Sequence, residues 1–385
     1  MTPRSRIALA RDAKLRGDTE AARGLLLEAW EDAATRAEAA EALWALHRAP
    51  GFSLRPDREQ LARTMALLGE GFRRHETPGF VVVSDASDRW TQERAKLLER
   101  ARSNFFRVAK RMGLAFHPHR HKLLCVLFDD QEAYRRFARD HDGVAADWVA
   151  GYYASGANRI VSYNDARSAD VTQARAQIEA ALAKVAKLRA DAHDAERRGD
   201  AALAGRMRAA AEGAERQVRL ASARLESGAT ESASAKVVHE AIHLLAYNTG
   251  VQRAGRDYPF WLTEGLATSF EFDGSAGAFG PDRSRGLASR RQAMKELAAS
   301  GQLAPIEVLL LARPTMEWDA TQAEAMYAQS HALFRVLFNR DPRAMGRYVE
   351  AIGDRGPGRM SAEEQLSLFT TVLCEPGAID LASER

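Results

Sequence analysis

The most informative segment of this chain is His239-Glu240-Ala241-Ile242-His243, followed by Trp261-Leu262-Thr263-Glu264-Gly265-Leu266-Ala267. Residues four apart on a helix share one face, so His239 and His243 can reach one metal ion. The chain between His243 and Glu264 is long enough for a turn and a second helix, which would return the carboxylate as a third ligand. Zinc binds such ligands in a tetrahedron, and a catalytic site keeps one position for water, from which Glu240 is placed to take a proton. The pattern therefore predicts a site that activates water to cleave an amide.

Both segments lie in runs that favour buried helices. Apolar residues flank the first motif, and Asn248-Thr249-Gly250 then supplies a helix stop. In the second segment Glu264 lies off the apolar stripe. The alternative is an ordinary amphipathic helix whose histidines are solvated or hydrogen-bonded in the core. The apolar residues are Val237, Val238, Ile242, Leu244 and Leu245 in the first segment and Trp261, Leu262, Leu266 and Phe270 in the second.

These motifs resemble those of the gluzincin metallopeptidases, such as thermolysin and aminopeptidase N. A closer resemblance is to a bacterial family of uncharacterised peptidase-MA-like proteins, in which a Y-x-Q-S segment follows, here Tyr327-Ala328-Gln329-Ser330. The resemblance covers about residues 79–345, apart from one insertion. It implies one zinc ion per chain, held by His239, His243 and Glu264, with Glu240 as the general base. It also matches Tyr327 to the tyrosine that donates to the developing oxyanion in aminopeptidase N relatives. The spacing from His243 to Glu264 is slightly longer than in those relatives.

Two further residues are candidates for roles around this site. Glu271 follows Glu264 by two helical turns, and it is predicted to accept the outer N–H of a ligating histidine, which would fix the tautomer of that histidine. His331 lies four residues after Tyr327 and is a candidate proton donor to the tetrahedral intermediate. The alternative for His331 is a histidine buried on a helix face.

Gly151, Tyr152 and Tyr153 read as part of a hairpin with residues 158–163. The resemblance implies that this strand borders the cleft, where a substrate backbone pairs with it. The sequence alone also permits a merely structural hairpin. Aminopeptidase N relatives carry here a glutamate that binds a free amine, whereas this chain has Tyr152, Tyr153 and Ala154. Endoproteolysis is therefore favoured over aminopeptidase activity.

The chain is predicted to have a mainly helical α+β fold. Residues 1–75 are predicted to form a helical region that weakly resembles tetratricopeptide repeats. A zincin-like domain, with a small mixed sheet and active-site helices, is expected from residues 79–167 and 229–385. Its strands are predicted at residues 80–83, 122–128, 151–153 and 158–163, with a long helix at 90–112. The glycine-rich segment 273–286 is predicted to be a loop beside the cleft.

Residues 168–228 are predicted to form an inserted antiparallel coiled-coil hairpin. Apolar residues alternate spacings of three and four, Gly199-Asp200 interrupts them, and a second stripe returns. The hairpin is either a spacer or an arm that docks a protein partner or covers the cleft. The two stripes are Val171, Ala174, Ile178, Ala181, Val185, Leu188, Ala192 and Ala195, then Leu203, Met207, Ala210, Ala214, Val218, Ala221 and Leu225.

Composition restricts the choice of partners. The net charge is only +3 although 28% of residues are charged, which argues against nucleic acid as a partner. No apolar run is long enough to cross a bilayer, and the N-terminus lacks a signal-peptide core. The expected location is therefore the cytoplasm, or outside it if the true start lies upstream. The expected partner is a peptide or protein substrate.

These observations leave three functional hypotheses. The first is a zinc-dependent endopeptidase. The second is a catalytically silent zinc-binding adaptor that acts through its helical arms, and the third is a metallo-amidase for non-peptide amides. Glu240 favours catalysis, because a structural metal site has no use for a base there.

Overall fold

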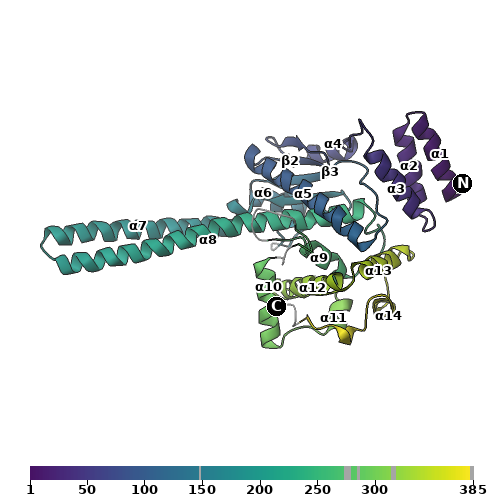
Figure 1. The fold of residues 1–385 in the computed structure, drawn as a ribbon. Helices are drawn as coiled ribbons and strands as arrows, with labels where there is room; N and C mark the ends of the chain where they lie inside the picture. The colour runs from purple at the N-terminus through teal and green to yellow at the C-terminus, as the bar shows by residue number, and fades with distance from the viewer. Residues whose placement is uncertain (147–148, 273–278, 284–286, 314–317, 382–385) are drawn as a thin grey trace.

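The computed structural model describes residues 1–146, 149–272, 279–283, 287–313 and 318–381, with backbone alone at residues 224, 226–233 and 320. The fold is α+β and mainly helical, with a small mixed sheet near the centre of the body and a long helical arm (Figure 1). Most of the glycine-rich segment 273–286, namely 273–278 and 284–286, lies outside the described residues. The helices before the arm are α1 (Pro3–Leu15), α2 (Thr19–Trp30), α3 (Arg36–His47), α4 (Arg58–Leu67), α5 (Asp88–Met112), α6 (Gln131–Asp142) and the 3-10 helix η1 (Asp165–Arg167).

The sheet has five strands in the order β1-β2-β3-β5-β4. Its three central strands run parallel, and an antiparallel strand closes each edge. Every residue of the three central strands is buried, and β2 and β3 are almost entirely apolar because both faces of the sheet are covered. The strands are β1 (Arg73–Glu76), β2 (Phe80–Ser84), β3 (Leu123–Phe128), β4 (Gly151–Ala154) and β5 (Arg159–Tyr163).

Alternate residues of the central strands enter different hydrophobic clusters. Phe80, Cys125 and Ile160 face the main core, whereas Val81 and Val161 face smaller clusters on the other side. The helices that share the main core are α5, α8 (Ala201–Asn248), α9 (Phe260–Thr268) and α12 (Ala320–Arg340). This follows from the period of two along a strand. The main core thus joins the sheet to the helices that carry the candidate site.

The sequence prediction of a helical region that extends to residue 75 is wrong at its end, because residues 73–76 form the strand β1. The polar strand β1 pairs antiparallel with β2, and its side chains are mostly exposed. An edge strand of charged residues lacks the apolar alternation by which strands are recognised. The helical N-terminal region therefore ends with α4.

The N-terminal helices are docked on the body through two tryptophans. Trp30 Nε1 donates to the carbonyl of Ala115 at 2.5 Å, and Trp44 Nε1 donates to that of Phe116 at 2.9 Å. Gly250 makes this approach possible, because a Cβ there would lie 2.2 Å from the Trp30 ring. The segment that follows α5 is therefore covered by α2 and α3.

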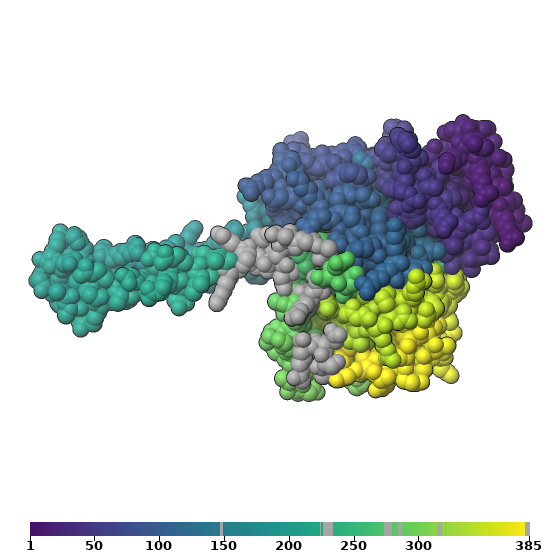
Figure 2. All heavy atoms as spheres, viewed as in Figure 1, coloured from purple at the N-terminus to yellow at the C-terminus, as the bar shows by residue number. Residues whose placement is uncertain are grey.

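The arm consists of α7 (Ala169–Arg197) and the first part of α8 (Ala201–Asn248). It projects from the body as a rod (Figure 2). Every residue of the predicted stripe in α7 is buried or half-buried. In α8 the predicted Ala210 and Ala221 are exposed, and their neighbours Ala211 and Ser222 are buried and half-buried instead. α8 has no break at residue 228 but continues into the body, so the arm and the HExxH motif belong to one helix.

Further helices complete the body after α8. α9 (Phe260–Thr268) packs against α12 (Ala320–Arg340), and α10 (Ala288–Ser300) also contacts α12. Gly265 allows the contact of α9 with α12, because a Cβ there would lie 2.5 Å from the carbonyl oxygen of Ser330. The remaining helices are α11 (Ile306–Leu311), α13 (Pro342–Asp354), α14 (Ala362–Val372) and the 3-10 helix η2 (Pro376–Ala378). Among the described residues, none of the helices has the length and apolar character needed to span a membrane.

Candidate metal centre

The final turns of α8 are buried on all faces but one. His239, Glu240 and His243 lie on the remaining face, which opens into a cleft of about 550 Å³. The helix ends at Asn248, followed by Gly250 with φ of 75°, as the sequence predicts. The core thereby fixes the direction in which the two imidazoles point. The fully buried residues that do this are Val237, Val238, Ala241, Ile242, Leu244, Leu245 and Ala246.

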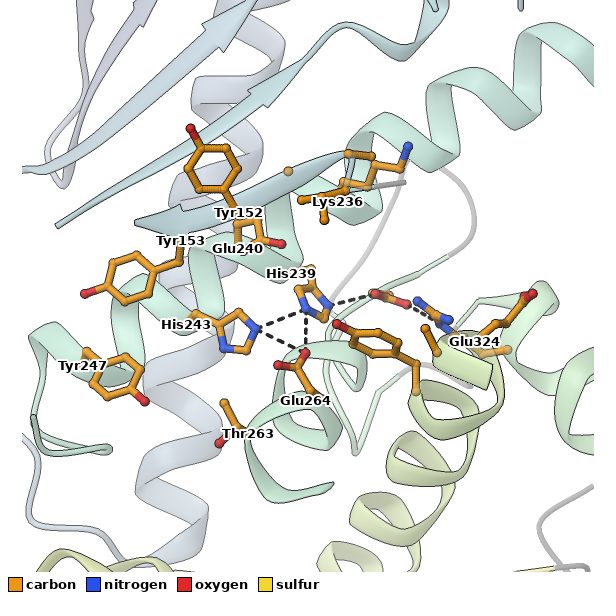
Figure 3. A pocket seen from close by; sticks show the side chains of 17 residues that line it. Tyr152, Tyr153, Lys236, His239, Glu240, His243, Tyr247, Thr263, Glu264 and Glu324 are labelled. Atoms are coloured by element: carbon orange, nitrogen blue, oxygen red, sulfur yellow. Dashed lines mark hydrogen bonds and ion pairs between the residues drawn. The ribbon is translucent and has the colours of Figure 1, made fainter. Parts of the chain in front are cut away.

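Three ligand atoms converge at this face (Figure 3). His239 Nε2 lies 3.0 Å from Glu264 Oε2 and 3.1 Å from His243 Nε2, and His243 Nε2 lies 3.4 Å from Glu264 Oε2. Glu264 comes from α9, which α12 and the main core hold against α8. The three side chains form a group that could hold a metal ion.

The spacing of these atoms fits a zinc ion. Ligand atoms 2.0–2.1 Å from zinc in a tetrahedron are roughly 3.3–3.4 Å apart, close to the three separations observed here. Two imidazole nitrogens and a carboxylate oxygen are also the donor set that zinc accepts. With three protein ligands, a fourth position remains for water, which is typical of a catalytic rather than a structural site.

The charges and hydrogen bonds within the group favour the protonated form of His239 and the anionic form of Glu264. Burial lowers the pKa of His239, but its hydrogen bonds with Glu264 and Glu271 outweigh burial and hold that pKa well above its ordinary value. Burial raises the pKa of Glu264, but the charge of His243 and the hydrogen bonds with both imidazoles hold it below its ordinary value. An anionic ligand facing two imidazoles is therefore maintained in the cleft wall.

Glu271 contacts the other nitrogen of His239. The His239 Nδ1–H donates to Glu271 Oε1 at 2.9 Å, and Glu271 Oε2 accepts from Arg290 Nε at 3.2 Å. Burial raises the pKa of Glu271, but the charge of Arg290 and the hydrogen bond from His239 lower it to about 2. The sequence predicts this contact, but it places Glu271 on the same helix as Glu264. In the structure α9 ends at Thr268, and Glu271 contacts His239 from the segment that follows the helix.

Glu240 lies on the cleft wall beside the ligand group. Among the described residues no side chain or backbone group forms a hydrogen bond or ion pair with its carboxylate, and burial raises its pKa. A carboxylate in this environment is free to accept a proton and to release it again.

Tyr327 and His331 occupy different environments although both lie on α12. Tyr327 lines the cleft, with its ring centroid 6.0 Å from that of His239. The charge of Glu264 and burial raise the pKa of Tyr327, so its hydroxyl keeps its proton. His331 is buried and is not among the cleft-lining residues that the structure describes, and burial lowers its pKa to about 4. The geometry brings Tyr327 to the ligand group but not His331.

The strand β4 forms one border of the cleft and is an edge of the sheet. Gly151 lies against Glu240, because a Cβ at Gly151 would be 3.4 Å from Glu240 Cγ. Tyr152 points away, and its hydroxyl donates to Asp142 Oδ2 at 2.7 Å, whereas Tyr153 lies over α8. The three residues therefore border the cleft with alternating orientations.

Sequence reasoning missed several cleft residues. Tyr247 follows His243, and Lys236 precedes His239, each by about one helical turn. This helical spacing is a signal that could have identified both residues. Arg290 comes from α10, and no spacing connects it to the motifs. Other polar lining residues that the sequence did not single out include Thr263 and Glu324.

Comparison with known protein families gives one match. The model of a family described as a protein of unknown function (DUF1570) matches residues 233–358, about a third of the chain. The matched segment contains the HExxH motif, Glu264, Glu271 and Tyr327. No curated protein matches this chain.

Proposed function

We propose that this protein is a zinc-dependent metallopeptidase that cleaves peptide bonds within polypeptide chains. The observation that carries the proposal is the convergence of the ligand atoms of His239, His243 and Glu264, with separations of 3.0 to 3.4 Å. Beside them Glu240 faces the same cleft without a partner among the described residues. The resemblance to gluzincins rests on these residues and supports the same function.

Each side chain has a separate part in the proposed chemistry. His239, His243 and Glu264 would hold zinc, and bound zinc supplies an electrophile that acidifies water and polarises a carbonyl. Glu240 accepts the proton of the attacking water and later delivers it to the departing amine. Tyr327 donates a hydrogen bond to the oxygen that gains negative charge.

The proposed substrate is an extended polypeptide. The unpaired edge of β4 offers backbone groups with which an extended chain can pair as an added strand. β4 carries no carboxylate for a free amine, which favours cleavage within a chain. Glu324 is a carboxylate on the opposite wall, but it lies beside the charge of Arg290. Paired peptides with free and acetylated N-termini test this point, and endoproteolysis predicts cleavage of both.

The proposal predicts different effects for two substitutions. Glu240→Gln should retain zinc but lower peptide hydrolysis by at least about a hundredfold, because it removes the general base and leaves the ligands. His243→Ala should lose both zinc and hydrolysis. Metal content and cleavage of a blocked, internally quenched peptide are measured on each purified, folded protein. Unchanged hydrolysis by the Glu240→Gln protein would remove the catalytic claim.

The same assays separate the alternative functions. Bound zinc without cleavage of any library peptide, together with capture of a partner by the arm, would favour a silent adaptor. Cleavage of non-peptide amides but not of peptides would favour a metallo-amidase.

A further inference from the structure

A stacked aromatic pair closes one end of the cleft. Tyr153 on β4 and Tyr247 on α8 both line the cavity, and their ring centroids lie 5.7 Å apart with an interplanar angle of 21°. Figure 3 shows the pair beyond His243, on the side of the ligand group opposite Glu324. The pair is therefore a wall of the cleft rather than part of the metal centre.

The Tyr153 ring is oriented by its hydrogen bond, and Tyr247 stacks on it. Tyr247 follows His243 by one turn on the helix that carries the ligands, so its ring shares their face. The Tyr153 hydroxyl donates to Asn158 Oδ1 at 3.0 Å, and Asn158 exchanges amide hydrogen bonds of 2.9 and 2.7 Å with Asn248. Asn158 has φ of 48°, the left-handed conformation that asparagine tolerates at a tight turn. The hairpin thus presents Tyr153 in one orientation.

The chemical character of this end differs from that of the opposite end. Burial raises the pKa of Tyr153 to about 12 and also raises the pKa of Tyr247, so both hydroxyls stay neutral. Lys236, Arg290 and Glu324 bring charge to the other end of the cleft. A ligand group that enters the aromatic end meets uncharged ring surface.

The way in which β4 packs on α8 sets the distance of the two tyrosines from Glu240 and the ligand group. Gly151 packs on Glu240, and Tyr153 lies two strand residues further, about 6.6 Å along β4. Tyr247 lies four helix residues beyond His243, about 6 Å along α8. Both displacements equal about two residues of an extended peptide.

We propose that Tyr153 and Tyr247 form a subsite that takes an aromatic side chain of an extended peptide, two residues from the cleaved bond. Aromatic rings gain from offset-stacked or edge-to-face contacts with one another beyond their area of burial. Tyr153 is oriented by the hydrogen bonds of Asn158 before the ligand arrives, which lowers the entropic cost of this contact. The inference rests on the proposed peptidase function only for the position of the cleaved bond.

Binding to the Glu240→Gln protein tests the subsite without hydrolysis. Fluorescent, doubly blocked peptides carry a single phenylalanine at successive positions of an alanine-glycine backbone, and affinity is measured by anisotropy with zinc present. We expect one position at which phenylalanine binds about tenfold more tightly than alanine. Tyr247→Ala should reduce this ratio to about one, whereas Tyr247→Phe, which keeps the ring, should retain it. Thermal unfolding of each protein shows that the fold persists.

Two outcomes distinguish the subsite from the peptidase proposal. If the wild-type protein cleaves peptides but no position prefers phenylalanine, or the preference survives Tyr247→Ala, the subsite is wrong and the peptidase stands. If the preference depends on Tyr247 but no peptide is cleaved, the aromatic site stands as a binding site and the peptidase proposal is wrong.

Discussion

Glu271 determines which nitrogen of His239 faces the ligand group. Its carboxylate accepts the Nδ1–H at 2.9 Å, which leaves the lone pair of Nε2 directed at the cleft. Arg290 in turn holds Glu271, and its guanidinium carbon lies 5.3 Å from the centroid of the Tyr327 ring. One arginine therefore supports both the proposed ligand His239 and the proposed oxyanion donor.

Arg290→Met should weaken zinc binding by about ten- to hundredfold, the usual cost of losing a group that orients a metal ligand. Without the guanidinium, Glu271 is a buried carboxylate with one partner fewer, and Tyr327 loses the cation over its ring. Competition with a chelator measures the zinc affinity. Lys295→Met, on the exposed side of the same helix, is the matched control and should bind zinc as the wild type does. Equal affinities for the two variants would remove the role given to Arg290.

The sequence predicts the positions of site residues that share one helix better than those of residues brought together from several helices. The positions of His239, Glu240 and His243 follow from helical periodicity. Glu264 was placed by the resemblance and by the length of the connecting chain. Arg290 could not be found, because its contact with Glu271 depends on how α10 packs.

The contact between α9 and α12 positions Glu264 relative to Tyr327. A Cβ on Gly265 would lie 2.5 Å from the backbone oxygen of Ser330 and 2.7 Å from Phe334 Cβ. The glycine next to the proposed ligand therefore sets the distance between the two helices.

Gly265→Ala should lower the free energy of unfolding by about 1–3 kcal/mol, because the helices must separate to admit the methyl group. Gly205→Ala on α8 is the matched control, since nothing lies within 4 Å of a Cβ there. It should stabilise the protein by up to about 1 kcal/mol through helix propensity. Urea unfolding measures both. A neutral Gly265→Ala would contradict the close approach of α9 and α12.

Most elements could be predicted because their local pattern is strong. The apolar runs of β2 and β3 and the long helix α5 lie within a few residues of the expected ranges. β1 was missed, and its first residues were assigned to the helical region, because a strand of charged residues at a sheet edge lacks apolar alternation. The continuity of α8 was missed because Gly228 and its small polar neighbours weaken the helical signal in the sequence.

Two histidines lie near the surface where the N-terminal helices pack on the body. His117 packs edge-on against Trp30, with ring centroids 4.8 Å apart, and His119 is fully buried. Burial lowers the pKa of His117 to about 4 and that of His119 to about 3. Both histidines are therefore neutral in the folded protein well below pH 6.

The stability of the protein should fall as the pH drops below about 6.5. The unfolded chain then binds protons that folded His117 and His119 exclude, which costs about 2 kcal/mol per histidine at pH 5. Above pH 6.5 both states leave the histidines neutral, and the effect vanishes. Denaturant unfolding at pH 7 and pH 5 measures the loss. His119→Asn, which keeps a donor for the carbonyl of His121, should reduce this loss by about 2 kcal/mol, whereas His193→Asn on the exposed arm should not. Parallel pH profiles for wild type and His119→Asn would exclude His119 as a cause of the loss.

The arm is joined to the site through a single helix. Its distal half is held by contacts of its own, such as the ion pair of Arg189 with Glu215 at 2.6 Å. At its base Lys236 pairs with Asp165 at 2.8 Å and also lines the cleft. The hairpin and its apolar stripes could be predicted from the periodicity of apolar residues. Periodicity does not indicate the residue at which the arm ends and the body begins.

A crystal structure of the zinc-soaked protein, with anomalous data collected at the zinc absorption edge, would show whether the three side chains bind the metal. We expect one anomalous peak per chain, bound by Nε2 of His239, Nε2 of His243 and the carboxylate of Glu264, with Glu240 facing the ion but not ligating it. A peak elsewhere in the chain, or none at these three side chains, would contradict this expectation.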